Sequence, residues 1–101
     1  MVLRPGARLV SSACETQVVV IRAPAGEVDL RCGGAPMAPM GAEVSPTELD
    51  GSRAEGSLLG KRYVSTDGLL EVLCTRGGRG SLWAADAQLV MKESKKLPSS
   101  D

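Results

Sequence analysis

One sequence pattern occurs twice in this chain and constrains its fold more than any other feature. Residues 6–12 (GARLVSS) and 60–66 (GKRYVST) share the pattern G-x-R-x-V-S-S/T. After a two-residue change in spacing, further pairs match: Glu15 with Asp67, Val18 with Leu70, Val20 with Val72, Ile21 with Leu73, Gly26 with Gly78, and Leu30 with Leu82. Because polar positions match as well as apolar ones, we interpret residues 6–34 and 60–92 as an internal duplication.

The first copy contains two segments with the residue pattern of β-strands. Residues 17–22 (QVVVIR) include four consecutive β-branched residues, which lose side-chain entropy in a helix. A continuous apolar run of this kind suits a strand covered on both faces. Residues 27–32 (EVDLRC) alternate between polar and apolar, the pattern of a half-buried strand. With a turn at 23–26 between them, the two segments predict a β-hairpin.

The other strand candidates are shorter or more ambiguous. They are residues 8–12, 61–66, 69–75, 81–84 and 88–92. In the third of these, Leu70, Val72 and Cys74 share one face of the predicted strand. The last two predict a hairpin around residues 85–87. A C-terminal helix is the alternative for residues 88–92, because good helix formers are frequent there.

The fold class follows from the size of the two copies. A unit of three strands cannot bury a face alone, so the two copies must pack together or close edge to edge. We predict one all-β domain over residues 1–101, a small barrel or sandwich of about six strands. Residues 35–59, which include several Gly and Pro, predict a long connecting loop with one short helical turn at 45–48 (SPTE). Residues 93–101 predict a flexible tail.

Composition excludes several classes of function. The chain has no His, so it has no Ser-His-Asp or Cys-His catalytic system and no His-ligated metal. Only 2% of its residues are aromatic, too few for a base-stacking platform. Lys and Arg balance Asp and Glu to a net charge of zero, whereas nucleic-acid-binding domains are usually basic. We therefore expect no nucleic-acid partner and no cofactor, and we assign no catalytic residue.

The apolar segments and the cysteines bear on location. No apolar run approaches the length of a membrane span, and the N-terminal residues lack the apolar core of a signal peptide. We expect no membrane association and a cytoplasmic location, where Cys14, Cys32 and Cys74 would stay reduced. Cys32 and Cys74 continue apolar strand faces and are expected in the core, whereas Cys14 is expected at the surface.

Two segments are candidate ligand sites. Arg76, Gly77, Gly78 and Arg79 form a Gly-rich turn that could present amide groups and charge to an anion. The alternative is a structural hairpin turn, since the turn precedes a strand and lacks the ending of a P-loop. Cys32, Met37 and Met40 could bind a soft metal such as Cu(I), but no second thiolate is close in sequence. Packing is the alternative there.

The function best supported by the sequence is a binding or accessory module without enzymatic activity. It would assemble with itself or with a partner protein, and a small-molecule ligand stays possible. The candidate interface residues are Met37, Met40, Tyr63 and Trp83, of which the two aromatic residues could equally serve in packing. A small-molecule or soft-metal carrier is the first alternative. The second is a small enzyme that uses a thiolate or a carboxylate.

Overall fold

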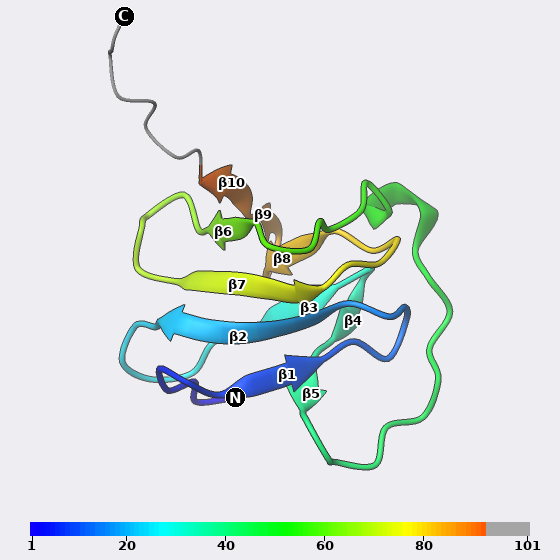
Figure 1. The fold of residues 1–101 in the computed structure, drawn as a ribbon, viewed down its shortest axis with the longest axis horizontal. Helices are drawn as coiled ribbons and strands as arrows, with labels where there is room; N and C mark the ends of the chain where they lie inside the picture. The colour runs from blue at the N-terminus through cyan, green and yellow to red at the C-terminus, as the bar shows by residue number, and fades with distance from the viewer. Residues whose placement is uncertain (93–101) are drawn as a thin grey trace, which may run out of the picture.

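The computed structural model describes residues 1–92 as an all-β fold with two antiparallel sheets (Figure 1). The larger sheet contains β1 (Arg8–Val10), β2 (Gln17–Arg22), β5 (Ala38–Pro39), β6 (Arg62–Val64), β7 (Glu71–Arg76) and β10 (Val90–Lys92), in the order β10-β6-β7-β2-β1-β5. The smaller sheet contains β3 (Leu30–Cys32), β4 (Ala35–Pro36), β8 (Leu82–Ala84) and β9 (Ala87–Gln88), in the order β4-β3-β8-β9. Neither sheet closes on itself within residues 1–92, and no helix in that range could span a bilayer.

Strand β2 shows how the residue pattern produces the fold. Its bounds are those predicted from the β-branched run. Val18 and Val20 are fully buried, whereas Val19 is half-buried and Ile21 is 38% exposed. The strand is therefore covered on one face only, and the prediction that both faces are covered is wrong. The outer face of the larger sheet is open to solvent.

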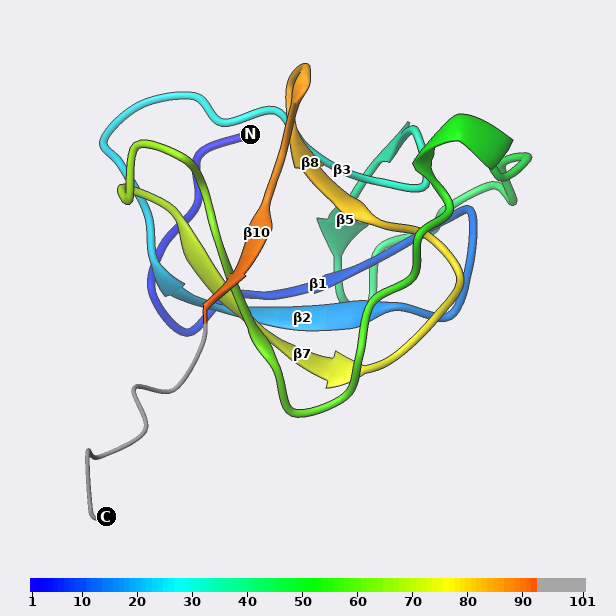
Figure 2. The ribbon, with the colours of Figure 1, turned by 90° about the horizontal axis from the view of Figure 1, so that it is seen from above.

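One apolar cluster connects the two sheets, and Figure 2 shows β3 and β8 lying over β1, β2 and β7. The larger sheet contributes Leu9, Val18, Val20, Tyr63, Val72 and Cys74, and the smaller sheet contributes Leu30, Cys32 and Leu82. Met37 and Leu89 are buried at the two points where the chain passes from the smaller sheet to the larger one. Burying each of these aliphatic side chains contributes roughly 1.5 to 3 kcal/mol.

The two halves of the chain use the same pairing scheme. In the first half β1 pairs with β2 and β5, while β3 pairs with β4. In the second half β6 pairs with β7 and β10, while β8 pairs with β9. The halves meet through β2 with β7 in one sheet and β3 with β8 in the other. Each half thus supplies strands to both sheets, instead of folding into one three-stranded unit.

The prediction of a hairpin between residues 17–22 and 27–32 is wrong. Strands β2 and β3 lie in different sheets, because the segment between them crosses from one sheet to the other. The alternating burial in the second segment is confirmed, since Val28, Leu30 and Cys32 are all buried. The face that they bury packs against the larger sheet and not against a hairpin partner.

Residues 35–59 are more structured than predicted. Strands β4 and β5 occupy the start of this segment, and a 3-10 turn, η1 (Gly51–Arg53), lies near its end. The cap of that turn is Asp50, whose Oδ1 accepts a hydrogen bond from the Ser52 amide at 2.9 Å. The helical turn predicted at residues 45–48 does not form.

The C-terminal part of the described chain is a strand and not a helix. The hairpin predicted from residues 81–84 and 88–92 is confirmed in part: β8 pairs with β9, and Ala84 lies opposite Ala87. Strand β10 then leaves this hairpin and pairs with β6 in the larger sheet. The alternative of a helix over residues 88–92 is therefore wrong. The tail predicted at 93–101 lies outside the described residues.

Candidate functional site

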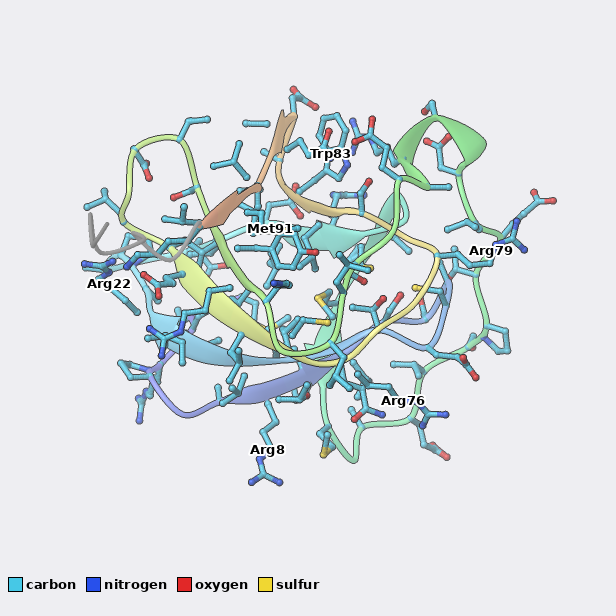
Figure 3. The ribbon with its side chains drawn as sticks, turned by 45° about the horizontal axis from the view of Figure 1, so that its top comes forward. Arg8, Arg22, Arg76, Arg79, Trp83 and Met91 are labelled. Atoms are coloured by element: carbon cyan, nitrogen blue, oxygen red, sulfur yellow. The ribbon has the colours of Figure 1, made fainter. Side chains whose placement is uncertain are left out.

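The Gly-rich turn predicted to bind an anion is occupied by contacts within the protein. Gly78 and Ser57 exchange two backbone hydrogen bonds, at 3.0 and 3.2 Å, and the Gly80 amide donates to Cys14 Sγ at 3.4 Å. The side chains of Arg76 and Arg79 lie apart (Figure 3). The Gly78 and Gly80 amides thus make contacts within the fold and are not free to bind an anion.

The four predicted interface residues separate into core and surface. Met37 and Tyr63 are only 2% and 7% exposed, so they belong to the core and not to an interface. Trp83 is half-buried, with the Arg53 guanidinium 4.2 Å above its ring and its Nε1 donating to Ser81 Oγ. Only Met40, at 43%, is largely exposed.

The three residues predicted to bind a soft metal also separate into core and surface. They are Cys32, Met37 and Met40. Cys32 and Met37 are buried in the core, whereas Met40 is on the surface. Within residues 1–92, no group of three or more His, Cys, Asp or Glu side chains is arranged to hold a metal ion. Cys32 and Met37 therefore contribute to the packing of the core, and Met40 lies at the surface.

The open face of the larger sheet carries a concentration of basic side chains that the sequence did not reveal. The strand registers place Lys92 opposite Arg62, Arg62 opposite Leu73, and Val19 opposite both Leu73 and Arg8. Directly opposed residues point to the same side of a sheet. Arg22 joins this side through its contact with Glu71, and Figure 3 shows Arg76 on the same side as Arg8. We call the side chains of Arg8, Arg22, Arg62, Arg76 and Lys92 the cationic face.

A buried carboxylate holds three of these cations together. Glu71 is only 2% exposed; its Oε1 lies 2.8 Å from Arg22 Nη2 and 3.2 Å from Lys92 Nζ, and its Oε2 lies 3.5 Å from Arg62 Nη1. Burial alone would raise the pKa of Glu71. The hydrogen bonds and charges of Lys92 and Arg22 outweigh that effect and hold the pKa below its usual value. The cations themselves remain at least half exposed.

Apolar side chains lie between the cations. Val19 and Leu73 face each other across β2 and β7 and are half-buried, with Arg8 beyond Val19 and Arg62 beyond Leu73. Val90 on the edge strand β10 is 51% exposed. The outer face thus combines an apolar centre with a basic surround, which is a common composition of protein-binding surfaces.

A second polar site surrounds Cys14, in the turn between β1 and β2. Cys14 Sγ lies 3.1 Å from Thr16 Oγ1 and 3.5 Å from Ser11 Oγ, and it accepts a hydrogen bond from the Gly80 amide. Thr16 is fully buried, and its hydroxyl is 2.6 Å from that of Ser57. Cys32 Sγ is 3.7 Å from Cys14 Sγ. The surface position predicted for Cys14 is confirmed in part, because the residue is half-buried.

The environments of these thiols differ in their effects on pKa. Burial alone would raise the pKa of Cys14, but hydrogen bonds from the Thr16 and Ser11 hydroxyls and from the Thr16 and Gly80 amides stabilise the thiolate and lower the pKa to about 7. Burial and the neighbouring charge of Cys14 raise the pKa of Cys32 to about 12. Burial also raises the pKa of Cys74. Cys14 is therefore the thiol expected to react near neutral pH.

The role of Thr16 can be tested by removing its hydroxyl. Thr16→Val should raise the pKa of Cys14 above about 7 and slow its alkylation at neutral pH roughly fivefold, because one donor to the thiolate is lost. The rate of reaction with iodoacetamide, followed against pH, measures this effect. Thr16→Ser retains the hydroxyl and should keep the wild-type profile. An unchanged profile for Thr16→Val would mean that the other donors suffice.

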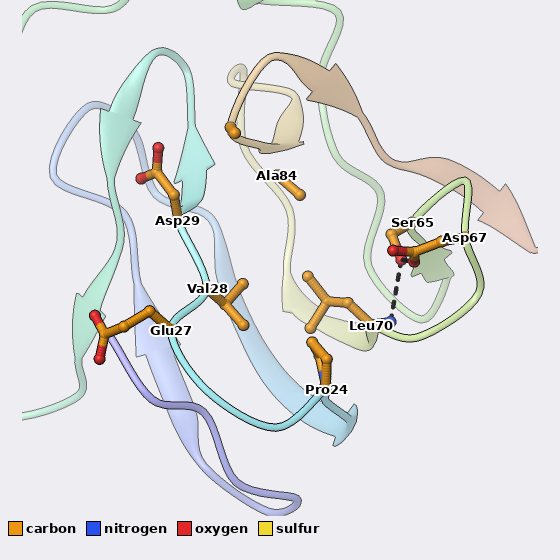
Figure 4. A pocket seen from close by; sticks show the side chains of 9 residues that line it. Pro24, Glu27, Val28, Asp29, Ser65, Asp67, Leu70 and Ala84 are labelled. Carbon is orange, nitrogen blue, oxygen red and sulfur yellow. Dashed lines mark hydrogen bonds between the residues drawn. The ribbon is translucent and has the colours of Figure 1, made fainter.

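A small open cavity lies at the opposite end of the fold. It has a volume of about 200 Å³, and its apolar wall includes Pro24, Val28 and Leu70 (Figure 4). The carboxylates at its rim already have partners: Glu27 pairs with the N-terminal amine, and Asp29 pairs with Arg31. Asp67 also lines the cavity; it accepts hydrogen bonds from the Ser65 hydroxyl and the Leu69 amide and forms no ion pair with a described residue. The cavity could accept a small apolar group.

Comparisons with known proteins supply no functional assignment for this chain. No protein-family model matches the sequence. No curated protein and no solved structure matches it either.

Proposed function

We propose that this protein is a non-enzymatic binding module whose cationic face docks an acidic protein surface. The observation that carries the proposal is the concentration of charge. The face bears five basic side chains. Two acidic side chains contact them: Glu71, which is buried, and Glu15, which is exposed and pairs with Arg76. The chain as a whole has a net charge of zero. A face with this local excess attracts a partner of opposite charge.

The chemistry of the face favours carboxylates on a protein partner. Arginine binds carboxylates through two parallel hydrogen bonds, and four of the five basic residues are arginines. The apolar centre around Val19 and Leu73 would pack against an apolar centre in the partner. A nucleic-acid partner is disfavoured, because Tyr63 is buried in the core and Trp83 belongs to the smaller sheet.

The proposal predicts charge-dependent binding of an acidic peptide. A fluorescein-labelled peptide of Glu, Asp and Leu serves as the probe, and its anisotropy reports binding to the full chain. The double variant Arg8→Glu/Arg62→Glu should weaken binding about tenfold or more, because each reversal replaces attraction by repulsion. Raising the ionic strength to about 0.5 M, where the Debye length is roughly 4 Å, should also weaken it.

Matched controls separate this surface from general charge effects. Arg79→Glu changes an exposed arginine that lies apart from Arg76, and it should leave the affinity within about twofold. Equal binding by wild type and by the double variant would contradict the proposal. So would equally tight binding of a single-stranded oligonucleotide of the same length. A concentration-dependent dimer in native mass spectra that the double variant abolishes would identify a second copy of this chain as the occupant, which would contradict a separate partner.

We also infer that the chain arose by duplication of a five-strand unit and that its two sheets form a pseudo-symmetric sandwich. The central registers support this. Strand β2 pairs Val18 with Cys74 and Val20 with Val72. Suppose that Val18 corresponds to Val72 and that Val20 corresponds to Cys74. Replacing both residues of the Val18–Cys74 pair by their counterparts then gives the Val72–Val20 pair. This assignment replaces the sequence-based match of Val18 with Leu70.

The backbone conformation at one turn gives independent support for duplication. Gly33, after β3, has a φ of +64°, and Ala85, after β8, has a φ of +54°. Ala85 is the only non-glycine residue with positive φ among residues 1–92. An alanine rarely adopts this conformation, because its Cβ crowds the backbone. Its presence at the position that corresponds to Gly33 is expected if both turns derive from one ancestral turn; the next residues differ, since Gly34 has a φ of +90° and Asp86 does not have a positive φ.

The setting proposed for this module is the cytoplasm. All three cysteines are free in the fold, and two of them are buried. Free thiols persist most readily in a reducing compartment. The small-molecule alternative is supported only by the open cavity near Val28, so it ranks below protein binding.

A further inference from the structure

Two thiols from distant parts of the sequence lie next to each other at one end of the core. Cys14 belongs to the turn between β1 and β2, and Cys32 is the last residue of β3 in the other sheet. Their sulfur atoms are 3.7 Å apart. Cys14 is partly accessible to solvent, whereas Cys32 is fully buried. One sulfur can therefore meet a dissolved reagent, and the other is shielded from it.

The contacts around the pair favour negative charge on Cys14 only. The Cys14 thiol donates to the hydroxyl oxygens of Thr16 and Ser11, and the Gly80 amide donates to Cys14 Sγ. When Cys14 loses its proton, the same two hydroxyl groups can donate to the thiolate instead. At neutral pH, a thiol with a pKa of about 7 has roughly fifteen times the thiolate fraction of an ordinary cysteine. Because the thiolate is the nucleophile in cysteine chemistry, oxidation should begin at this residue.

We propose that Cys14 and Cys32 form a reversible intramolecular disulfide when the protein meets a hydroperoxide. The Cys14 thiolate attacks the peroxide, an S–O bond forms, the O–O bond breaks, and the leaving oxygen takes a proton to become an alcohol or water. Cys32 sulfur then attacks Cys14 sulfur, so that the S–S bond forms and the S–O bond breaks. The departing hydroxide takes the Cys32 proton and leaves as water. The two thiols supply the two electrons that reduce the peroxide.

The local geometry allows the second step. A disulfide requires the sulfur atoms to approach to about 2.05 Å from the observed 3.7 Å. The two turns are in close contact, since a Cβ placed on Gly33 would lie 3.3 Å from Ala13 Cβ. Oxidation of Cys14 to the neutral sulfenic acid also removes the charge that opposes ionisation of Cys32.

The experiment uses the reduced full chain and one equivalent of hydrogen peroxide at neutral pH. After denaturation with N-ethylmaleimide, most chains should carry one label instead of three and should remain monomeric without reductant. Trypsin places Cys14, Cys32 and Cys74 on the separate peptides 9–22, 32–53 and 63–76, so the linked pair can be identified by mass. Dithiothreitol should restore three labels. A linkage that involves Cys74, or a linkage between chains, would overturn the proposal.

Variants that each lack one cysteine distinguish the two steps. Cys32→Ser should still oxidise at Cys14, and the sulfenic acid that accumulates should react with dimedone. Cys14→Ser should keep both remaining thiols under the same treatment. Cys74→Ala is the matched control and should form the disulfide as the wild type does. Accumulation of sulfinic acid on wild-type Cys14 without any linked peptide, or no reaction of Cys14 at all, would refute the proposal without reliance on any variant.

Discussion

Gly80→Ala is expected to lower the free energy of unfolding by about 2 to 4 kcal/mol. A Cβ at this position would lie 2.9 Å from both Cα and N of Gly33 and 3.0 Å from Cys32 Sγ. The first two are backbone atoms of the turn after β3, which cannot move without disturbing the smaller sheet. The gain of about 0.4 to 1 kcal/mol from reduced freedom of the unfolded chain is too small to offset this overlap.

Urea unfolding followed by tryptophan fluorescence measures this change, and the thermal midpoint should fall by about 10 °C or more. The matched control is Gly51→Ala, because a Cβ there meets nothing within 4 Å and the residue does not have a positive φ. The control should stay within about 0.5 kcal/mol of wild type. If both variants unfolded at the same urea concentration, close packing at Gly80 would not be a source of stability.

Close approaches of this kind also explain the other glycines of the turn, for which the sequence indicates an anion site or a hairpin turn. A run of glycines predicts positive φ angles, yet none of Gly77, Gly78 and Gly80 has one. Each is required by a close approach: at Gly78, for example, a Cβ would lie 2.5 Å from Thr16 Oγ1. Local sequence cannot reveal an approach of this kind, because Thr16 is distant along the chain.

The strands were predictable where alternation and β-branched residues determine them. The bounds of β2 follow from its run of β-branched residues. The burial of Leu70, Val72 and Cys74 follows from their alternation, because burial of one face imposes a period of two. Which strands pair could not be predicted in the same way. Strand β2 was assigned to a hairpin with the following segment, but its partners are β1 and β7.

The candidate sites could not be predicted from the sequence either, because they depend on which strands pair and how the sheets pack. Cys14 and Cys32 continue two unrelated local patterns, and only the packing of one sheet on the other brings their sulfurs together. The cationic face collects arginines from separate strands, none of which forms a basic run. Met37 is a candidate interface residue by sequence, but it fills the core where the chain passes between the sheets.

Glu71→Gln should destabilise the fold by about 1 to 2 kcal/mol at neutral pH. The substitution keeps the shape of the side chain but removes the charge that holds Arg22, Arg62 and Lys92. A larger loss is not expected, because the cations are at least half exposed and can be hydrated when the carboxylate is absent. Glu15→Gln removes an exposed carboxylate paired with Arg76 on the same face, and it should change stability by less than about 0.5 kcal/mol.

The stability difference between the wild type and Glu71→Gln should depend on pH, and the sign of this dependence can be worked out. The pKa of Glu71 is lower in the folded state than in the unfolded state, so the unfolded state binds its proton more tightly. The stability that this carboxylate contributes is fully present above the unfolded pKa, about 4.3, and is lost as the pH falls through the folded pKa. The difference in unfolding free energy between wild type and Glu71→Gln should therefore shrink as urea titrations are repeated at successively lower pH below this value. A difference that stayed constant throughout would assign the effect to packing of the side chain and not to its charge.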